Sequence, residues 1–308
     1  MFDKQPTNDV ELHDLLNKQF YAEYDTDYFL DKAIINAGMI AKPLEYIRIL
    51  SAGYEVGKIK IGELDEVDTR SFSKNAKREL VVNSYHGIET FFRLLFACVE
   101  YPKCTWLGLV ELNDFAAFKK RVNQISAHTY FKDDQSEVLA ELLLGPREGI
   151  PDLDDGGWEK NKRVIQDLVD RIAHDLLSTP DYNVYKHGVA LFDTEFGFSL
   201  GDIIKMDKQE AFIFLSKAQK KTETEIIETY SKNYKFMKWE IRFATTYLTG
   251  HLISNLVNLS SVRLGVKKSA SIKPFHHYDL HQILETGIIT DTIGELLVER
   301  HYARKKKN

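Results

Sequence analysis

Two cysteines, Cys98 and Cys104, are all that this 308-residue chain contains. A small fold stabilised by disulfides normally carries more, and two thiols alone cannot fill a four-ligand structural zinc site. The chain also lacks an apolar run long enough to cross a bilayer, and its first residues show no basic segment followed by an apolar one, as an export signal would. We therefore expect a cytoplasmic protein with no membrane partner.

The chain also has little that points to a cofactor or a metal. It contains no GxGxxG and no GxxxxGK[ST] sequence, the glycine-rich motifs that bind dinucleotides and nucleotide phosphates. His277 and His281 have the spacing of a helical metal site, but no glutamate lies between them as in HExxH, and no third ligand is evident. The sequence therefore predicts neither a cofactor nor a metal site.

Charge limits the possible partners. The formal net charge of -5 argues against a protein that coats nucleic acid non-specifically, because that affinity comes from clustered Lys and Arg. The one evident basic cluster is terminal, comprising Arg300 and residues 304–307. We interpret it as a solvated tail; a helix end whose cations complement the helix dipole is the alternative.

Apolar spacing predicts a mainly α fold with three long helices. The first covers about 70–99, where apolar residues recur every three or four positions. The second follows the acidic 152–157 loop and ends before Pro180, and the third spans about 234–264. The buried stripe of the first helix consists of Val81, Tyr85, Ile88, Phe92, Leu95 and Val99.

Between the second and third helices the period changes to two, with Phe196, Phe198 and Leu200 alternating with small residues. We therefore expect a helical bundle with a small antiparallel β insertion. The bundle covers residues 69–265, with the insertion at about 188–230. An N-terminal helical or irregular segment precedes it (1–68), in which 47–67 fits either a hairpin or a broken helix. A helical appendage and basic tail follow it (266–308).

The most distinctive local string is DYNVYKHG, residues 181–188, between the end of a helix and the start of a strand. Asn183, Lys186 and His187 together offer an amide, a fixed cation and a group that titrates near neutrality. Such a set can orient and polarise a phosphodiester. The alternative is a capping segment in which Asn183 or Asp181 satisfies backbone amides.

A polar row accompanies the apolar stripe of the first long helix. His86, Glu89 and Arg93 are spaced three and four residues apart, so their side chains can meet on one helical face. Glu89 could orient His187 or Lys186 if the helices pack side by side. An ordinary Glu–Arg helical pair beside a satisfied histidine is the alternative.

A long helix with an internal acidic residue, a second helix and an Asn-x-x-x-His string resemble the HEPN superfamily of helical domains. The resemblance implies RNA binding or metal-independent ribonuclease activity, with His187 as general acid/base and Asn183 and Lys186 positioning phosphate. It also implies a homodimer and a substrate surface formed by Tyr182, Tyr185, Arg93 and His86. Tyr182 stands where the family motif has Arg, so the guanidinium that would stabilise phosphate charge is missing, and Lys186 is its only local substitute.

The same features also fit a protein without catalytic activity. The helices present broad apolar surface, the net charge is acidic, and no complete catalytic set is evident. The second hypothesis is therefore a helical interaction protein that acts as a homodimeric regulatory partner.

Overall fold

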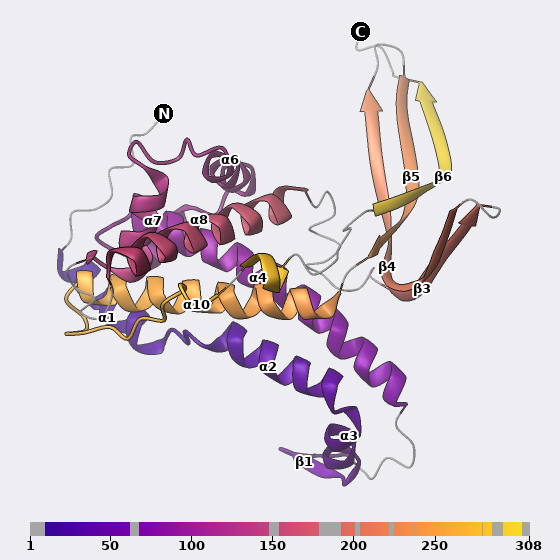
Figure 1. Cartoon of the computed structure of the whole chain (residues 1–308), viewed down its shortest axis with the longest axis horizontal. Helices are drawn as coiled ribbons and strands as arrows, with labels where there is room; N and C mark the ends of the chain where they lie inside the picture. Colours follow the sequence, from indigo (N-terminus) through magenta and orange to yellow (C-terminus); the bar gives the residue numbers. More distant parts are fainter. Residues whose placement is uncertain are drawn as a thin grey trace. The chain divides into compact units, whose positions relative to one another are not determined.

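The computed structural model describes residues 10–61, 68–147, 154–178, 192–200, 204–221, 225–236, 238–278, 280–284 and 292–303. The fold is mainly α with an antiparallel sheet, as the sequence predicts (Figure 1). In chain order the elements are α1 (Val10–Glu23), α2 (Tyr28–Ala41), α3 (Pro43–Ser51), β1 (Tyr54–Val56), β2 (Ile59–Ile61), α4 (Thr69–Glu100), α5 (Thr105–Glu111), α6 (Phe115–Ser126), α7 (Gln135–Leu144), α8 (Asp155–Ser178), β3 (Phe192–Leu200), β4 (Ile204–Lys221), β5 (Glu225–Phe236), α10 (Trp239–Arg263), α11 (Leu280–Leu284) and β6 (Thr292–Ala303).

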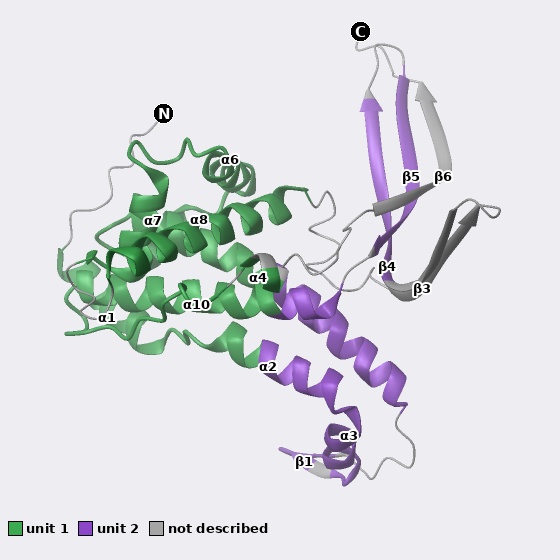
Figure 2. Ribbon diagram, viewed as in Figure 1, with its two compact units in different colours: residues 1–32, 86–180, 244–284 green, residues 33–85, 181–243, 285–308 purple. Residues whose placement is uncertain are grey.

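The chain folds into two compact units, each assembled from segments far apart in sequence (Figure 2). Unit 1 comprises residues 1–32, 86–180 and 244–284, and unit 2 comprises residues 33–85, 181–243 and 285–308. Helices α2, α4 and α10 each contribute residues to both units. The first two long helices of the sequence prediction are confirmed as α4 and α8.

Two helices of unit 1, α6 and α7, each begin at an aspartate that caps the helix. The side chain of Asp114 accepts a hydrogen bond from the Ala117 amide at 2.8 Å at the start of α6, and Asp134 accepts one from the Ser136 amide at 2.9 Å at the start of α7. These carboxylates satisfy amides that have no partner within the helix and complement the helix dipole. Helix α7 ends at Gly145, whose φ of 87° favours glycine.

The core of unit 1 is aromatic along the C-terminal half of α4. Phe92 and Phe96 are fully buried, and the ring of Phe96 lies 6.1 Å from that of Phe118 on α6. Helix α5 approaches α4 closely because Gly108 has no side chain: a Cβ there would lie 3.0 Å from the Cβ of Ala97. Helices α6 and α7 both contact α8, which completes the bundle.

Unit 2 contains a four-stranded antiparallel sheet in the order β3-β4-β5-β6 (Figure 1). The long strand β4 pairs with β3 along its first half and with β5 along its second half. The two halves overlap at residues 211–213; Phe212, for example, pairs with Asp193 on one side and Lys235 on the other. Strand β6 pairs along β5, with a register shift between Tyr230 and Ser231.

The sheet is larger than the predicted insertion, and this corrects two expectations. The third helix was expected from about Tyr234, but α10 begins at Trp239, because Tyr234 and Lys235 pair with β4. The predicted helical appendage at 266–308 is also wrong for most of its described residues: 292–303 form β6, and only 280–284 are helical. Pairing with β5 overrides local preference in this segment.

The described part of the ambiguous 47–67 segment, residues 47–61, combines both of its alternatives. The short helix α3 ends at Ser51, and a hairpin of β1 and β2 follows around Gly57, whose φ is 60°. A positive φ at this position is typical of the tight turn in a two-residue hairpin loop.

Candidate functional site

The residues of the YNVYKHG string lie outside the part of the chain that the structure describes. They fall between Ser178, the last residue of α8, and Phe192, the first residue of β3. The predicted site residues concerned are Tyr182, Asn183, Tyr185, Lys186 and His187. Their roles stay predictions.

The polar row on α4 forms a fixed ion pair. Glu89 is 5% exposed, and its Oε1 accepts a hydrogen bond from Nε of Arg93 at 2.7 Å, so the prediction that the two meet on one helical face is confirmed. The same guanidinium donates to the Leu112 carbonyl at 3.2 Å and lies 4.7 Å from the ring centroid of Phe118. His86 is partly exposed, one turn earlier. The pair ties α4 to the end of α5 and to α6, a positional role.

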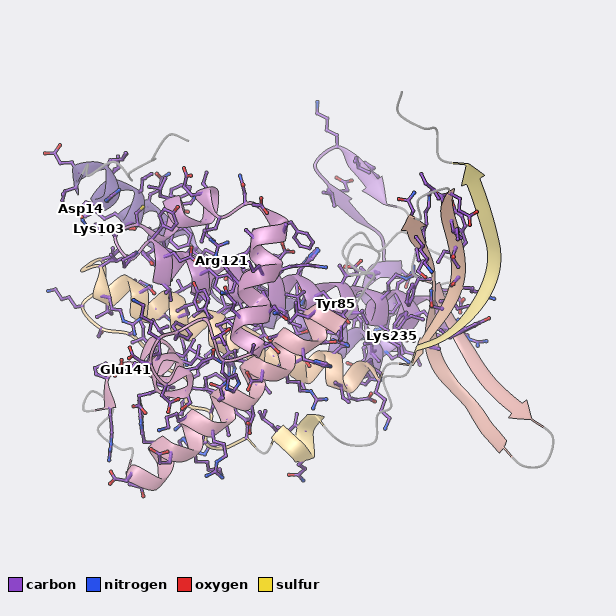
Figure 3. All side chains as sticks on the ribbon, turned by 90° about the horizontal axis from the view of Figure 1, so that it is seen from above. Asp14, Tyr85, Lys103, Arg121, Glu141 and Lys235 are labelled. Atoms are coloured by element: carbon purple, nitrogen blue, oxygen red, sulfur yellow. The ribbon has the colours of Figure 1, made fainter. Side chains whose placement is uncertain are left out.

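Two buried cations converge on Tyr85 in unit 2. Lys235, at the end of β5, donates from Nζ to the Tyr85 hydroxyl at 3.3 Å, and the guanidinium of Arg242 on α10 lies 4.8 Å from the Tyr85 ring centroid. Lys235 is 7% exposed and Arg242 3% exposed. Figure 3 shows Tyr85 and Lys235 near one another on α4 and β5. The phenol oxygen and the ring face stabilise positive charge here, so the cluster fixes β5 and α10 on α4.

Sequence reasoning did not find this cluster, because Lys and Arg normally face solvent and Lys235 was expected at the start of a helix. The cluster becomes visible only with the strand pairing. Lys235 pairs with Phe212 and therefore shares a sheet face with it, and Phe212 is buried. A lysine on the buried face of a strand requires a specific partner.

A histidine–carboxylate pair that the sequence gave no reason to expect lies in unit 1. His128, directly after α6, has a φ of 54°, and its Nε2 lies 2.9 Å from Oδ2 of Asp170 on α8. Gln166 donates to the other carboxylate oxygen at 2.8 Å. In a general-base arrangement a carboxylate orients an imidazole, and the imidazole in turn contacts a nucleophile such as a hydroxyl or a thiol. Among the described residues, the side-chain hydrogen bonds of the pair lead to Gln166 and not to a hydroxyl or thiol.

Two buried asparagines hold the non-helical segment that follows α10. Asn255 donates to the Lys273 carbonyl at 2.8 Å and accepts from the Lys273 amide at 2.9 Å. Asn161 of α8 is fully buried, and its Oδ1 accepts from the amides of Phe275 and His276 at 2.6 and 2.8 Å. Its Nδ2 lies 3.0 Å from Nδ1 of His276, so that nitrogen must be an unprotonated acceptor. The segment is thus fixed to α8 and α10.

Histidines in this region are held neutral. His251 of α10 lies beside the Tyr278 hydroxyl, which is 3.5 Å from its Nδ1. Burial lowers the pKa of His251 to about 4, and the charge of Lys273 contributes to the lowering. The pKa of His276 is also lowered, chiefly by burial. Neutral imidazoles of this kind stabilise a fold above mild acid rather than supply a proton donor.

The thiol of Cys98 belongs to a hydroxyl network. Its Sγ lies 3.3 Å from the Ser260 hydroxyl and 3.7 Å from the Thr105 hydroxyl, which in turn contacts the Tyr21 hydroxyl at 2.7 Å. Burial raises the pKa of the Cys98 thiol and that of Tyr21. A thiol held in its neutral form is a poor nucleophile, so this network is structural.

One more motif of the sequence, a match to the serine hydrolase pattern, lies in the sheet. Residues 197–201, GFSLG, fit the GxSxG pattern of serine hydrolases. A nucleophile elbow joins a strand to a helix, whereas Ser199 pairs with Lys205 within the antiparallel β3–β4 hairpin. The local topology therefore does not fit hydrolase chemistry.

The described residues contain no group of three or more His, Cys, Asp or Glu side chains that could hold a metal ion. Among the helices described, none combines the length and apolar character needed to span a membrane. Comparison of the chain with protein-family models, curated proteins and solved structures finds no match. Its function must therefore be argued from its own residues.

Proposed function

We propose that the protein binds RNA as a HEPN-like domain and cleaves it weakly without a metal. His187 is the general acid/base, Asn183 and Lys186 position the phosphate, and Tyr182 and Tyr185 contact the substrate. The observation that carries the proposal is the YNVYKHG string, which follows α8 and precedes β3 in the sequence. The two long helices that precede the string in the resemblance, α4 and α8, are both formed.

The chemistry requires no metal. The 2′-hydroxyl of the RNA attacks the adjacent phosphorus, the bond to the 5′-oxygen breaks, and the products are a 2′,3′-cyclic phosphate and a free 5′-hydroxyl. In this scheme His187 takes the proton from the 2′-hydroxyl or returns one to the 5′-oxygen. Asn183 donates a hydrogen bond to a phosphate oxygen, and Lys186 offsets its negative charge.

Cleavage of labelled single-stranded and structured RNAs in EDTA tests this proposal. We expect His187→Ala to lower the cleavage rate by about 10²-fold or more, the usual contribution of general acid–base catalysis, and to leave RNA affinity nearly unchanged. His128→Ala is the matched control, because it removes the histidine of the pair with Asp170. Activity lost in the control but kept in His187→Ala would move the chemistry to that pair and refute the proposal.

Exposed apolar side chains in unit 2 favour a second candidate function, a non-enzymatic homodimer. Helix α3 has no buried residue, and an isolated two-stranded hairpin such as β1–β2 is marginal in water. A covering partner would stabilise both elements. The exposed residues are Ile34 (50%), Ile35 (48%), Leu44 (70%), Ile49 (69%), Val56 (57%) and Ile59 (67%).

Sedimentation tests the homodimer. We expect wild type to sediment as a dimer and Ile49→Glu to sediment as a monomer, because a buried, unpaired carboxylate is costly at an apolar interface. Val110→Glu is the matched control, since Val110 is 58% exposed on α5 in unit 1. A wild-type protein that is monomeric at every concentration would exclude this candidate.

A further inference from the structure

The register of the sheet sorts its side chains onto two faces. Residues paired across an antiparallel ladder point to the same side, and successive residues alternate. Phe212 and Phe214 of β4 therefore share a face with their partners Lys235 and Asn233 of β5. All four are buried, and this is the face on which Lys235 reaches Tyr85.

The opposite face has a different composition. On β4 it carries Leu215, which is 58% exposed, and Lys217, which is also exposed. On β5 it carries Tyr230, Lys232 and Tyr234, all partly exposed. We call these five residues the tyrosine–lysine face.

Its cations and rings are interleaved. The Nζ of Lys217 lies 5.4 Å from the ring centroid of Tyr230, its cross-strand partner. The Nζ of Lys232 lies 4.9 Å from the ring centroid of Tyr234, two residues further along the same strand. Tyr230 and Tyr234 are about 13 Å apart along β5, with Lys232 between them. Aromatic side chains alternating with cations are the pattern on which single-stranded nucleic acids stack their bases and neutralise their phosphates.

Strand β6 leads to the basic cluster of the sequence. By register, the end of β4 and the end of β6 lie on either side of the start of β5. Strand β6 ends at Ala303, and the sequence continues with Arg304, Lys305, Lys306 and Lys307. The basic cluster of the sequence therefore follows directly from a strand that borders the tyrosine–lysine face.

Carboxylates on this face oppose an anionic ligand: by register Glu295 of β6 lies opposite Lys232, and Glu228 lies near Lys217. Glu228 pairs with Lys217 at 2.5 Å and accepts a hydrogen bond from the Tyr230 hydroxyl at 3.1 Å. The pKa of Glu228 is lowered, chiefly by its bond with Lys217, so it is charged at neutral pH. A phosphate that approaches Lys217 competes with this carboxylate.

We infer that the tyrosine–lysine face is the platform on which the protein binds single-stranded RNA. The inference rests on the proposed function and names its substrate class and a binding surface on the sheet. Bases stack on Tyr230 and Tyr234, and phosphates contact Lys217 and Lys232. Paired bases in a duplex are already stacked on each other and do not offer their faces to such a platform.

Fluorescence anisotropy with a labelled oligouridylate, compared with a duplex RNA of equal length, tests this inference. We expect the Tyr230→Ala, Tyr234→Ala double variant to bind the single strand about tenfold or more weakly, because base–aromatic stacking supplies much of such affinity. The matching double Phe variant keeps both rings and should bind as wild type does. Tyr28→Ala is the control, since Tyr28 is exposed on α2 in unit 1 and also carries a lysine, Lys32, over its ring.

Glu228→Gln supplies a test in the opposite direction. Removing the competing carboxylate should tighten single-strand binding several-fold and make it more sensitive to salt, since Lys217 then contributes a further phosphate contact. Loss of structure would weaken binding, so a gain cannot arise from misfolding.

The outcomes separate the inference from the proposed function. Wild type that binds no RNA would overturn both. Wild type that binds RNA, with unchanged affinity in the double Ala variant, would overturn the platform and leave the proposed function standing. Equal affinity for duplex and single strand would also overturn it. A last outcome is that the double Ala variant loses dimerisation and keeps its affinity for RNA. That result would identify a second copy of the chain, and not RNA, as the occupant of this face.

Discussion

Acid should destabilise unit 1 through one buried histidine. His251 is 5% exposed, and its ring centroid lies 4.4 Å from that of Tyr247 and 6.2 Å from that of Tyr278. Burial lowers its pKa from the ordinary 6.5 to about 4; the Lys273 cation adds to this lowering, and the Asp27 carboxylate opposes it. Lys273 and Asp27 face each other at 3.4 Å, so the two charges largely offset one another and burial dominates.

The sign and the size of the effect follow from proton linkage. The unfolded chain takes up a proton at His251 as the pH falls below its ordinary pKa, whereas the folded protein does not until the pH nears the lowered pKa. The free energy of unfolding therefore decreases over the interval from 6.5 to about 4. Between neutral pH and pH ~5 this single group removes about 2 kcal/mol.

Urea unfolding across this pH range, followed by circular dichroism, measures the effect. In His251→Phe, which keeps an aromatic ring among Tyr247 and Tyr278, most of the loss at mild acid should disappear. A smaller dependence of the unfolding free energy on pH should remain in this variant, because the pKa of His276 is lowered too. The control His174→Gln removes an exposed histidine of α8, keeps His251 and should keep the pH dependence. Equal pH slopes in wild type and His251→Phe would refute the reasoning.

Three further substitutions should lower the free energy of unfolding measured by chemical denaturation. Asn161→Ala leaves two backbone amides without their acceptor and should cost about 2–4 kcal/mol, whereas an unchanged value would show that the segment after α10 is not held by that side chain. Gly108→Ala places a Cβ against α4 and should cost about 1–3 kcal/mol. An increase in stability, as the higher helix propensity of Ala alone predicts, would contradict the close approach of α5 to α4. Glu89→Gln leaves the Arg93 guanidinium without its carboxylate and should cost about 1–2 kcal/mol. The double variant that also carries Arg93→Gln should lose less stability, because no cation is then left without its partner.

The helices were predictable because their signal is local. The stripe through Ile88, Phe92 and Leu95 is set by 3.6 residues per turn, and all three are buried in α4. The start of α10 was not predictable in this way: Tyr234 and Lys235 continue an acceptable helical pattern, and only pairing with β4 shows that they belong to a strand. Strand β6 is a harder case still, because its partner β5 lies more than fifty residues earlier in the sequence.

The polar contacts also divide into local pairs, which the sequence predicts, and distant pairs, which it does not. Glu89 and Arg93 were expected to meet because they are four residues apart on one helix. Lys235 and Tyr85 are 150 residues apart, and Asn161 and Phe275 are 114 apart, so no local spacing links them. Such pairs are set by the fold, and a single sequence carries no signal of the partner.

The proposed function and the platform make separable claims about RNA, because they concern different steps. Stacking on Tyr230 and Tyr234 is equally strong before and during bond cleavage, so its loss should raise the concentration of RNA needed for half-maximal rate and leave the maximal rate unchanged. In the proposed function His187 acts only as bonds change, so its loss should lower the maximal rate and leave affinity unchanged. If both claims hold, the chain is a weak catalyst and the sheet supplies much of its binding energy. Parallel effects of both sets of variants on rate and affinity would instead indicate one continuous site.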